Sequence, residues 1–206
     1  MQSWYQQALN LFFPEACIHC GAQQQHPLLL CSQCLIELPQ HLHPITAPEL
    51  LQDLWGLAEY YSPIGSVIRR CKYKPDERIM RTIVHRMHIS TVPWNQFDVI
   101  THVPTTFHRR FSRGFDQAQL LAQKLALATK KPYLSLLNRI ESKAQSLRSY
   151  NDRKKDLSVR FSCKKKPPDR ILIVDDVCTT GSTLDACAMA LLNEGAKSIS
   201  GIVLGY

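Results

Sequence analysis

The sequence predicts an α/β fold with a mostly parallel sheet and a small cysteine-rich module before it. Three observations indicate this fold: short apolar runs alternate with helical stripes in the larger, C-terminal part, four cysteines cluster near the N-terminus, and one apolar run ends in two acids and a glycine-containing turn. With 206 residues, of which 45% are hydrophobic and 20% charged, the chain can bury a core of its own. This composition excludes collagen, coiled coils and wholesale disorder.

The N-terminal part holds the cysteines between a short helix and a linker. Ser3 can cap an amphipathic helix that Pro14 ends. Several prolines punctuate the segment after the cysteines, as is typical of a linker. We therefore expect a helix, a cysteine-rich module and a linker in residues 1–48, followed by the main domain in residues 49–206.

The main domain is expected to alternate strands and helices. Ser62 and Pro63 supply a natural cap and first helical position, and Gly195 can end a later helix. The apolar run 171–174 is bounded by charged residues, as central parallel strands are. Alternation of this kind predicts a parallel sheet with helices on its faces. The expected order is a strand over 57–61, helices over 64–73 and 76–89, a strand over 98–103, a helix over 115–129, a strand over 171–174, a helix over 182–193 and a strand over 199–204.

Residues 138–168 fit neither pattern. They are polar and basic and show no sustained hydrophobic period. A segment of this length is uncommon as a passive connection in a compact domain, and such segments tend to be functional or mobile.

Charge is distributed unevenly along the chain. The net charge is +8, yet all 25 lysines and arginines follow Ile68. A basic domain attracts polyanions or phosphorylated small molecules, and a solvated basic surface without a partner is the alternative. The longest apolar runs are too short to span a bilayer and no signal peptide is evident, so we expect a cytoplasmic protein without membrane insertion.

Four cysteines form two CxxC pairs near the N-terminus. Cys17 and Cys20 make the first pair, Cys31 and Cys34 make the second, and Gly21 directly follows the first pair. Two such pairs can aim four thiolates at one point, which is the tetrahedral sulfur site that zinc prefers. We therefore predict a structural zinc site with these four ligands; iron–sulfur ligation or a redox pair is the alternative.

A phosphate-binding turn is predicted after the apolar run 171–174. The run ends in Asp175 and Asp176, and a turn containing Gly181 then leads into a helix. Backbone amides at the helix start can surround one phosphate together with side-chain hydroxyls. Two acids would repel that phosphate, so they indicate a sugar diol or a magnesium ion beside it. The spacing matches neither a P-loop nor a dinucleotide fingerprint. The hydroxyls belong to Thr179, Thr180, Ser182 and Thr183.

This segment resembles the phosphoribosyl-pyrophosphate (PRPP) motif of type I phosphoribosyltransferases, which has four apolar residues, two acids, two apolar residues and Thr-Thr-Gly-Ser-Thr. Together with the four-cysteine module, nearly the whole chain resembles the ComF/GntX family of bacterial competence-associated proteins. At Asp116 the family pattern more commonly has asparagine. Further matches are Lys72-Tyr73, Val103-Pro104, Arg113-Gly114-Phe115 with Gln117-Ala118, and Arg139 with Gln145, Arg153 and Phe161.

The resemblance implies a type I phosphoribosyltransferase-like sheet and assigns roles to the motif. Asp175 and Asp176 would bind the ribose hydroxyls, residues 179–183 would bind the 5′-phosphate, and magnesium would accompany the pyrophosphate. These two acids and Arg139 are the expected catalytic residues. The other implied contacts are Arg109, Arg113 and Gly114 in a pyrophosphate loop over 104–114, and Arg139 itself in a flexible loop over 138–168.

Two functions remain open. The first is an enzyme that transfers phosphoribose to a nitrogen nucleophile. The second is a PRPP-binding scaffold that binds single-stranded DNA and competence partners such as a helicase or DNA-processing proteins. The resemblance favours a role in DNA uptake, or in the use of DNA as a nutrient, for either one. The expected DNA contacts are Lys154, Lys155, Lys164, Lys165 and Lys166 with Tyr150 and Phe161 as stacking partners, and solubilisation of a loop is the alternative role of these lysines.

Overall fold

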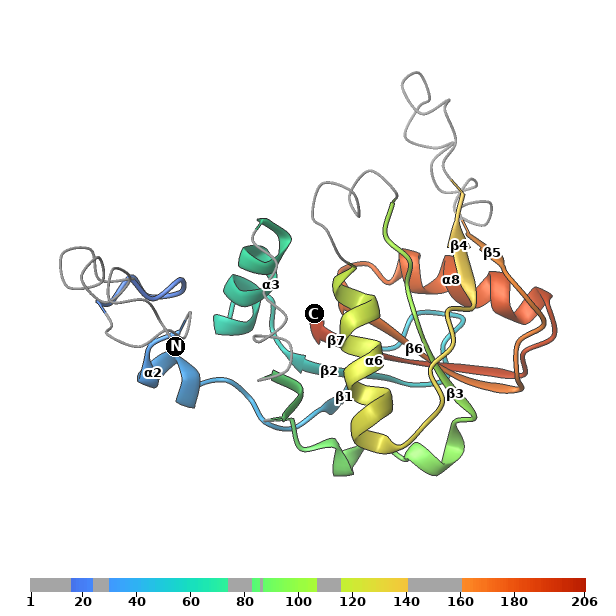
Figure 1. Ribbon diagram of the computed structural model, residues 1–206, viewed down its shortest axis with the longest axis horizontal. Helices are drawn as coiled ribbons and strands as arrows, with labels where there is room; N and C mark the ends of the chain where they lie inside the picture. Colours follow the sequence, from blue (N-terminus) through green and yellow to red (C-terminus); the bar gives the residue numbers. More distant parts are fainter. Residues whose placement is uncertain (1–15, 24–29, 74–82, 86, 107–115, 141–160) are drawn as a thin grey trace, which may run out of the picture.

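A five-stranded sheet organises the protein (Figure 1). The computed structural model describes residues 16–23, 30–73, 83–85, 87–106, 116–140 and 161–206. The strands lie in the order β1-β2-β7-β6-β3, and β1 is antiparallel to β2 while the other neighbours are parallel. This arrangement confirms the predicted α/β fold with a mostly parallel sheet. The bounds are His43–Ile45 for β1, Leu54–Ala58 for β2, Ser198–Gly205 for β7, Arg170–Val177 for β6 and Val99–His102 for β3.

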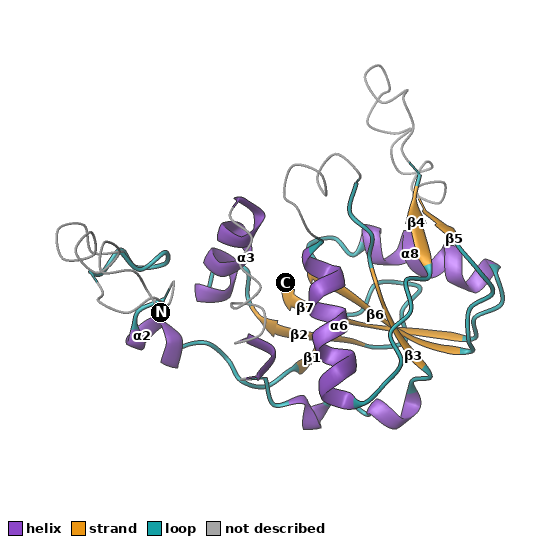
Figure 2. Cartoon of the chain, in the orientation of Figure 1, coloured by secondary structure: helices purple, strands orange, loops and turns teal. Residues whose placement is uncertain are grey.

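Helices cover both faces of this sheet (Figure 2). On one face α3 and α6 share an apolar cluster with Leu172 and Val174 of β6, and on the other face α8 shares a cluster with Ile171 and Ile173. Alternate residues of a strand point to opposite faces, so a strand that is covered on both sides is apolar throughout. The helices are α2 (Ser32–Ile36), α3 (Pro63–Tyr73), α6 (Gln117–Thr129) and α8 (Ser182–Asn193), with short 3₁₀ helices η1 (Ile89–Thr91) and η2 (Trp94–Gln96).

A two-stranded ribbon stands beside the β3 edge, made of β4 (Leu137–Arg139) and β5 (Phe161–Cys163). The chain reaches it alongside β3, where Ile100 N–H donates to the Pro132 carbonyl at 2.9 Å. Phe161 is only 5% exposed and belongs to the α8 cluster. The sequence predicted no regular structure for residues 138–168. Strands of three residues among polar neighbours are too short to show a hydrophobic alternation.

Several predicted elements match the observed ones. The helix over 182–193 is confirmed, and α3 and α6 begin within two residues of their predicted starts. In the second predicted helix, over 76–89, residues 83–85 are helical, but the prediction is wrong at its end, because His88 bridges to His41 and Ile89 begins η1. The stretch 74–82 lies outside the described residues, as does the expected N-terminal helix. No helix of the described part has the length and apolar character needed to cross a membrane.

Other elements differ from the prediction. β6 continues beyond Val174 to Val177, because β7 pairs with it there and Asp175 lies opposite Val203. β2 covers Leu54–Ala58, so it begins and ends earlier than the predicted strand over 57–61. The segment His43–Ile45, which we expected in the linker, forms an edge strand on β2. Pairing with a neighbouring strand determines each of these bounds, and the residues next to a strand do not indicate such pairing.

Candidate functional site

The turn between β6 and α8 leads into a helix start that no side chain caps. Gly181, the residue directly before α8, adopts a left-handed conformation with φ of +73°. A Cβ atom at this position would lie 2.5 Å from Pro48 Cγ, so both the backbone and the available space require glycine. The first amides of a helix have no intrahelical partners, and Gly181 has no side chain to cap them. The turn therefore offers backbone donors to an anion.

Hydroxyl groups surround these amides. Thr179, Thr180 and Thr183 are exposed, while Ser182 is half-buried. Thr180 Oγ1 and Ser182 Oγ lie 3.0 Å apart and share a hydrogen bond. Each hydroxyl has one donor that can rotate, so the group can direct several hydrogen bonds at one phosphate.

A segment from the N-terminal part of the chain holds this turn from outside. Pro48 packs on Gly181, and Leu50 N–H donates to Asp185 Oδ1 of α8 at 2.9 Å. Gln52 N–H donates to the Ile199 carbonyl of β7 at 2.8 Å. The segment 48–52 thus fixes the start of α8 against the sheet. This role was not predicted, because nothing local to Pro48 signals a contact so distant along the chain.

The two carboxylates occupy the end of β6, directly before the turn. Asp175 and Asp176 are half-buried, and the Asp176 N–H donates to Asp175 Oδ1 at 2.8 Å. Burial raises the pKa of Asp175 well above the usual carboxyl range, and the charges of Asp176 and Asp116 act in the same direction. Hydroxyl donors or a divalent cation would stabilise the ionised form. Carboxylate oxygens are ligands that magnesium accepts, so the donor set fits a sugar diol or that metal.

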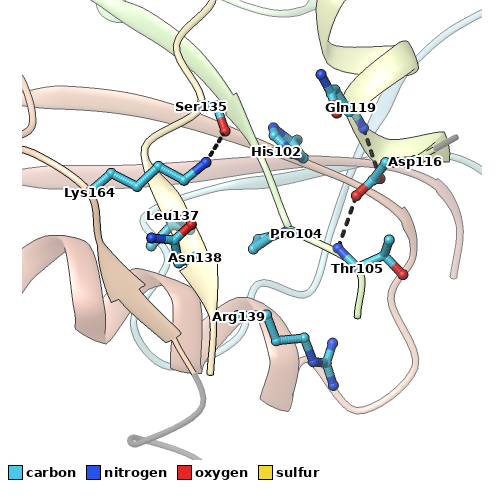
Figure 3. Close-up of a pocket in the computed structure, with 10 residues that line it drawn as sticks. All are labelled: His102, Pro104, Thr105, Asp116, Gln119, Ser135, Leu137, Asn138, Arg139 and Lys164. Atoms are coloured by element: carbon cyan, nitrogen blue, oxygen red, sulfur yellow. Dashed lines mark hydrogen bonds between the residues drawn. The ribbon is translucent and has the colours of Figure 1, made fainter. Parts of the chain in front are cut away.

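A cavity of about 510 Å³ opens at the carboxyl end of β3 (Figure 3). Because β3 pairs with β6 in parallel, the cavity lies at the same end of the sheet as the Asp175–Thr183 turn, which contributes none of its lining. Residues of β4 line its other side. Arg139 is held there by its neighbour on β5, since its guanidinium carbon lies 5.4 Å from the centre of the Phe161 ring. The Arg139 charge also reaches α8, where it lowers the pKa of the Cys187 thiol against the larger raising effect of burial. The lining residues are His102, Pro104, Thr105, Asp116, Gln119, Ser135, Leu137, Asn138, Arg139 and Lys164.

Asp116 shapes this cavity from the start of α6. One of its carboxylate oxygens accepts from Thr105 N–H at 2.9 Å, and the other accepts from Gln119 N–H at 3.2 Å and caps the helix. The same side chain therefore fixes both the chain leaving β3 and the helix that follows. Asparagine has one acceptor oxygen and could not accept both bonds in the same geometry, which gives a physical reason for aspartate at this position.

The fold brings only part of the expected site together. Arg139 and Pro104 line the cavity, while Asp175 and Asp176 lie on the adjacent strand β6. His102 was not expected: it is buried, lines the cavity and shares a hydrogen bond with the Tyr133 hydroxyl at 2.9 Å. Some expected contacts lie outside the described residues. For the pyrophosphate these are Arg109, Arg113 and Gly114, and for DNA they are Tyr150, Lys154 and Lys155.

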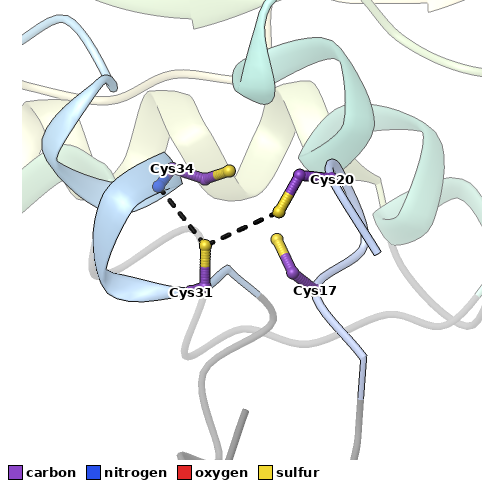
Figure 4. A group of neighbouring side chains, drawn as sticks. All are labelled: Cys17, Cys20, Cys31 and Cys34. Carbon is purple, nitrogen blue, oxygen red and sulfur yellow. Dashed lines mark hydrogen bonds between the residues drawn. The ribbon is translucent and has the colours of Figure 1, made fainter. Parts of the chain in front are cut away.

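The four N-terminal cysteines converge as predicted (Figure 4). All four sulfur atoms lie within 4.8 Å of one another. Cys20 and Cys31 sulfurs are 3.7 Å apart, and Cys34 N–H points at Cys31 Sγ over 3.5 Å. Gly21 adopts φ of +74°, which lets the first pair turn tightly. This group could hold a metal ion, and its donor set fits tetrahedral zinc.

The thiols of this group differ in their pKa values. Burial acts to raise the pKa of Cys17, but the backbone amides of Cys20, Cys31 and His19 lower it to about 6. Burial raises the pKa of Cys34 well above that of an ordinary thiol, and the other three cysteines add to this effect. Thiolates crowded so closely repel one another, and a bound cation would relieve that repulsion.

Known proteins resemble this chain over most of its length. A family model of the phosphoribosyl transferase domain matches residues 110–205. Competence protein F of Haemophilus influenzae is 28% identical, with 89% of this chain and 81% of that protein covered. DNA utilization protein YhgH of Escherichia coli is 29% identical, with 89% and 80% covered. Competence protein ComFC of Bacillus subtilis is 28% identical, with 75% and 65% covered.

Among solved structures, an allosteric regulatory enzyme of purine biosynthesis aligns with 62% of this chain and 24% of that enzyme's chain. The TM-score is 0.40 and the sequence identity 21%, which is a remote likeness. The matches to sequences confirm the resemblance stated above, because they join the phosphoribosyl transferase model to relatives named for competence and DNA utilization. Residues 110–205 thus match the phosphoribosyl transferase domain, and the chain has bacterial homologues named competence protein F, ComFC and YhgH.

Proposed function

We propose that this protein binds PRPP with magnesium at the end of β6 and transfers its phosphoribose to a nitrogen nucleophile. The observation that carries the proposal is the pairing of two adjacent carboxylates with an uncapped, hydroxyl-lined helix start, since a phosphate alone would not favour the carboxylates. In this assignment residues 49–206 form the phosphoribosyltransferase-like domain and residues 1–48 the metal-binding module. We expect the protein to act in the cytoplasm in the uptake or use of DNA, as the names of its relatives suggest.

The ribose would lie over the end of β6. Asp175 and Asp176 would accept hydrogen bonds from its hydroxyls, which is favourable because charge-assisted hydrogen bonds are stronger than neutral ones. The amides that follow Gly181 and the hydroxyls of residues 179–183 would hold the 5′-phosphate. Magnesium, held through the pyrophosphate and these carboxylates, would neutralise charge on the leaving group.

The pyrophosphate would extend from the ribose toward the β3 cavity. Arg139 lines that cavity and offers a planar guanidinium, which suits phosphate oxygens. In the transfer, the bond from C1 of the ribose to the pyrophosphate oxygen breaks as a bond from the acceptor nitrogen to C1 forms, and the acceptor proton passes to solvent. Arg139 would stabilise the negative charge that the leaving oxygen gains. Arg109, Arg113 and Gly114 complete the proposed pyrophosphate contacts.

The second candidate function is a non-catalytic scaffold that binds PRPP, single-stranded DNA and competence partners. Lys165 and Lys166 are exposed after β5, and Lys164 donates to Ser135 Oγ at 2.6 Å. A cluster of exposed lysines can bind a phosphate backbone. The expectation that Phe161 stacks on DNA bases is wrong, however, because this ring is buried against α8.

The cysteine group would hold a structural zinc ion in either function. Its four sulfur donors match the ligands of closed, tetrahedral zinc sites. Small modules of this kind gain most of their folding free energy from the metal, so the ion would hold the first and second CxxC pairs together.

Pyrophosphate release separates the two functions. Purified protein is mixed with magnesium and PRPP, alone and with a panel of bases, nucleosides and single-stranded oligonucleotides. Release stimulated by one compound supports the enzyme, and bound PRPP without release supports the scaffold. The Asp175→Asn/Asp176→Asn variant should lose either activity. Asp169→Asn is the matched control, because this exposed acid pairs with Lys197 at the other end of β6. Unchanged PRPP binding and release in the double variant would contradict the proposal.

A further inference from the structure

Two tyrosines and an arginine gather at the carboxyl end of β2. We call Tyr60, Tyr61 and Arg69 the aromatic platform. Tyr61 is 88% exposed, the highest value among the large apolar side chains of the described residues. The Tyr60 and Tyr61 rings lie 6.2 Å apart at 74°, and the Arg69 guanidinium lies 5.3 Å from the centre of the Tyr60 ring. The Tyr60 ring thus contacts both the planar cation of Arg69 and the exposed ring of Tyr61.

The backbone beneath the platform is fixed. Tyr60 N–H donates to the Tyr206 carbonyl at 2.9 Å, and Ser62 N–H donates to the Glu59 carbonyl at 3.0 Å. A Cβ atom on Gly65 would lie 1.6 Å from the Tyr60 carbonyl oxygen, so α3 packs directly against this turn. Arg69 is held in turn by its hydrogen bond to Ser66 Oγ at 2.9 Å. Tyr61 is thus presented to solvent by an ordered turn, so the backbone beneath it need not be ordered when a ligand stacks on the ring.

The platform lies next to the proposed ribose site. β7 separates β2 from β6, and Gly205 near the end of β7 lies close to both the Tyr60 ring and Val177. A Cβ atom on Gly205 would be 3.3 Å from Tyr60 Cδ2 and 3.7 Å from Val177 Cγ2. Val177 is the last residue of β6, so the platform borders the turn that follows it. Figure 1 shows the end of β2 beside α3 and close to the C-terminus. The C-terminus directly follows β7.

We propose that the aromatic platform binds a nucleobase, which stacks on the exposed ring of Tyr61, while Tyr60 and the Arg69 guanidinium packed on it form the rest of the surface. This inference rests on the proposed function, because it names the side from which the acceptor approaches. The cavity that would take the pyrophosphate lies at β3, on one side of β6, and the platform lies beyond β7, on the other. A nucleophile that displaces pyrophosphate enters opposite the leaving group. Aromatic faces and arginine planes bind bases of any sequence through stacking and cation–π contacts.

The base can belong to a free compound or to a single strand, and two arms of one experiment distinguish these sources. Fluorescence anisotropy measures binding of a labelled oligothymidylate at low salt, and saturation-transfer NMR measures binding of free bases and nucleosides. Tyr61→Ala should weaken binding at least about fivefold, given the contribution of one stacked base. Tyr61→Phe keeps the ring and should bind as the wild type does. Arg69→Lys keeps the charge without the plane and should fall between them.

Leu127→Ala is the matched control, since Leu127 is 77% exposed on α6, away from the platform. Binding only in the oligonucleotide arm identifies a strand as the ligand, and binding in the free-base arm identifies an acceptor base. The proposal is overturned if the wild type binds in neither arm, if Tyr61→Ala binds as tightly as the wild type, or if Leu127→Ala loses as much.

Failure of the platform is distinguishable from failure of the proposed function. Calorimetry with ribose 5-phosphate reports the turn after β6 alone, and Tyr61→Ala should leave that affinity unchanged. If ribose 5-phosphate binds and no base or strand does, the platform is wrong and the ribose site stands. If bases bind through Tyr61 and ribose 5-phosphate does not bind, the proposed function is wrong and the platform stands.

Discussion

Gly181→Ala tests how tightly the turn after β6 is built. The substitution adds one methyl group at a residue with φ of +73° and directs it at Pro48, whose Cγ and Cβ would lie 2.5 Å and 2.9 Å away. Ordinary carbon contacts are about 3.5–4.0 Å. The proline ring cannot rotate aside, and Leu50 beside it is tied to Asp185. The variant must therefore distort either the turn or the segment 48–52.

Two costs add in this variant. A left-handed backbone costs an L-residue roughly 1–2 kcal/mol relative to glycine, and overpacking typically costs about 1–3 kcal/mol. The free energy of unfolding should thus fall by about 2–5 kcal/mol. For a chain of this size each kcal/mol corresponds to about 2–4 °C in Tm, so Tm should fall by at least about 4 °C. Affinity for ribose 5-phosphate should fall as well, because the displaced residue precedes the amides that receive the phosphate.

Pro48→Gly separates the two costs, because it removes both atoms that the new methyl group would meet. Urea unfolding of the wild type, both single variants and the double variant completes a double-mutant cycle. The double variant should be more stable than the sum of the single effects by about 1–3 kcal/mol, which is the overpacking cost. Additive effects, or a Gly181→Ala variant as stable as the wild type, would refute the packing of Pro48 on this turn.

Two further predictions follow from the carboxylates and the cysteines. Burial raises the pKa of Asp175 in the folded state, so the protonated form favours folding at low pH, and this contribution is lost as pH rises through the folded pKa. Asp175→Asn should therefore raise Tm at pH 8 more than at pH 4. An equal change in Tm at both pH values would contradict the burial of this charge. Purified protein should contain close to one zinc per chain by elemental analysis. The Cys17→Ser/Cys34→Ser variant should lose the metal and have a lower Tm. A full metal content in that variant would rule out the four-sulfur site.

Local sequence signals determine much of the fold. α8 matches its predicted bounds because a helical stripe lies between two glycines, Gly181 and Gly195, that both adopt positive φ. The four cysteines converge because their spacing already fixes two tight turns. These features depend on residues close together in the chain, so the sequence records them directly.

Features that depend on distant contacts were missed. The ribbon formed by β4 and β5 is visible only through the burial of Phe161 against α8. The extension of β6 through Asp175 follows from its pairing with Val203, although acids are uncommon in strands. The contact between Pro48 and Gly181 joins residues more than a hundred positions apart. No local pattern carries such information, and each of these features borders the candidate site.

The most direct test of the central claim is calorimetric titration of the protein with PRPP in the presence of magnesium. In Asp175→Asn/Asp176→Asn each side chain keeps its size, and the bond from Asp176 N–H to residue 175 keeps an acceptor oxygen. Two anionic acceptors are lost, and charge-assisted hydrogen bonds contribute roughly 1.5–3 kcal/mol each. We predict that the wild type binds and that the double variant binds at least about tenfold more weakly with an unchanged circular dichroism spectrum. Equal affinity in the two proteins would contradict the assignment of PRPP to the end of β6.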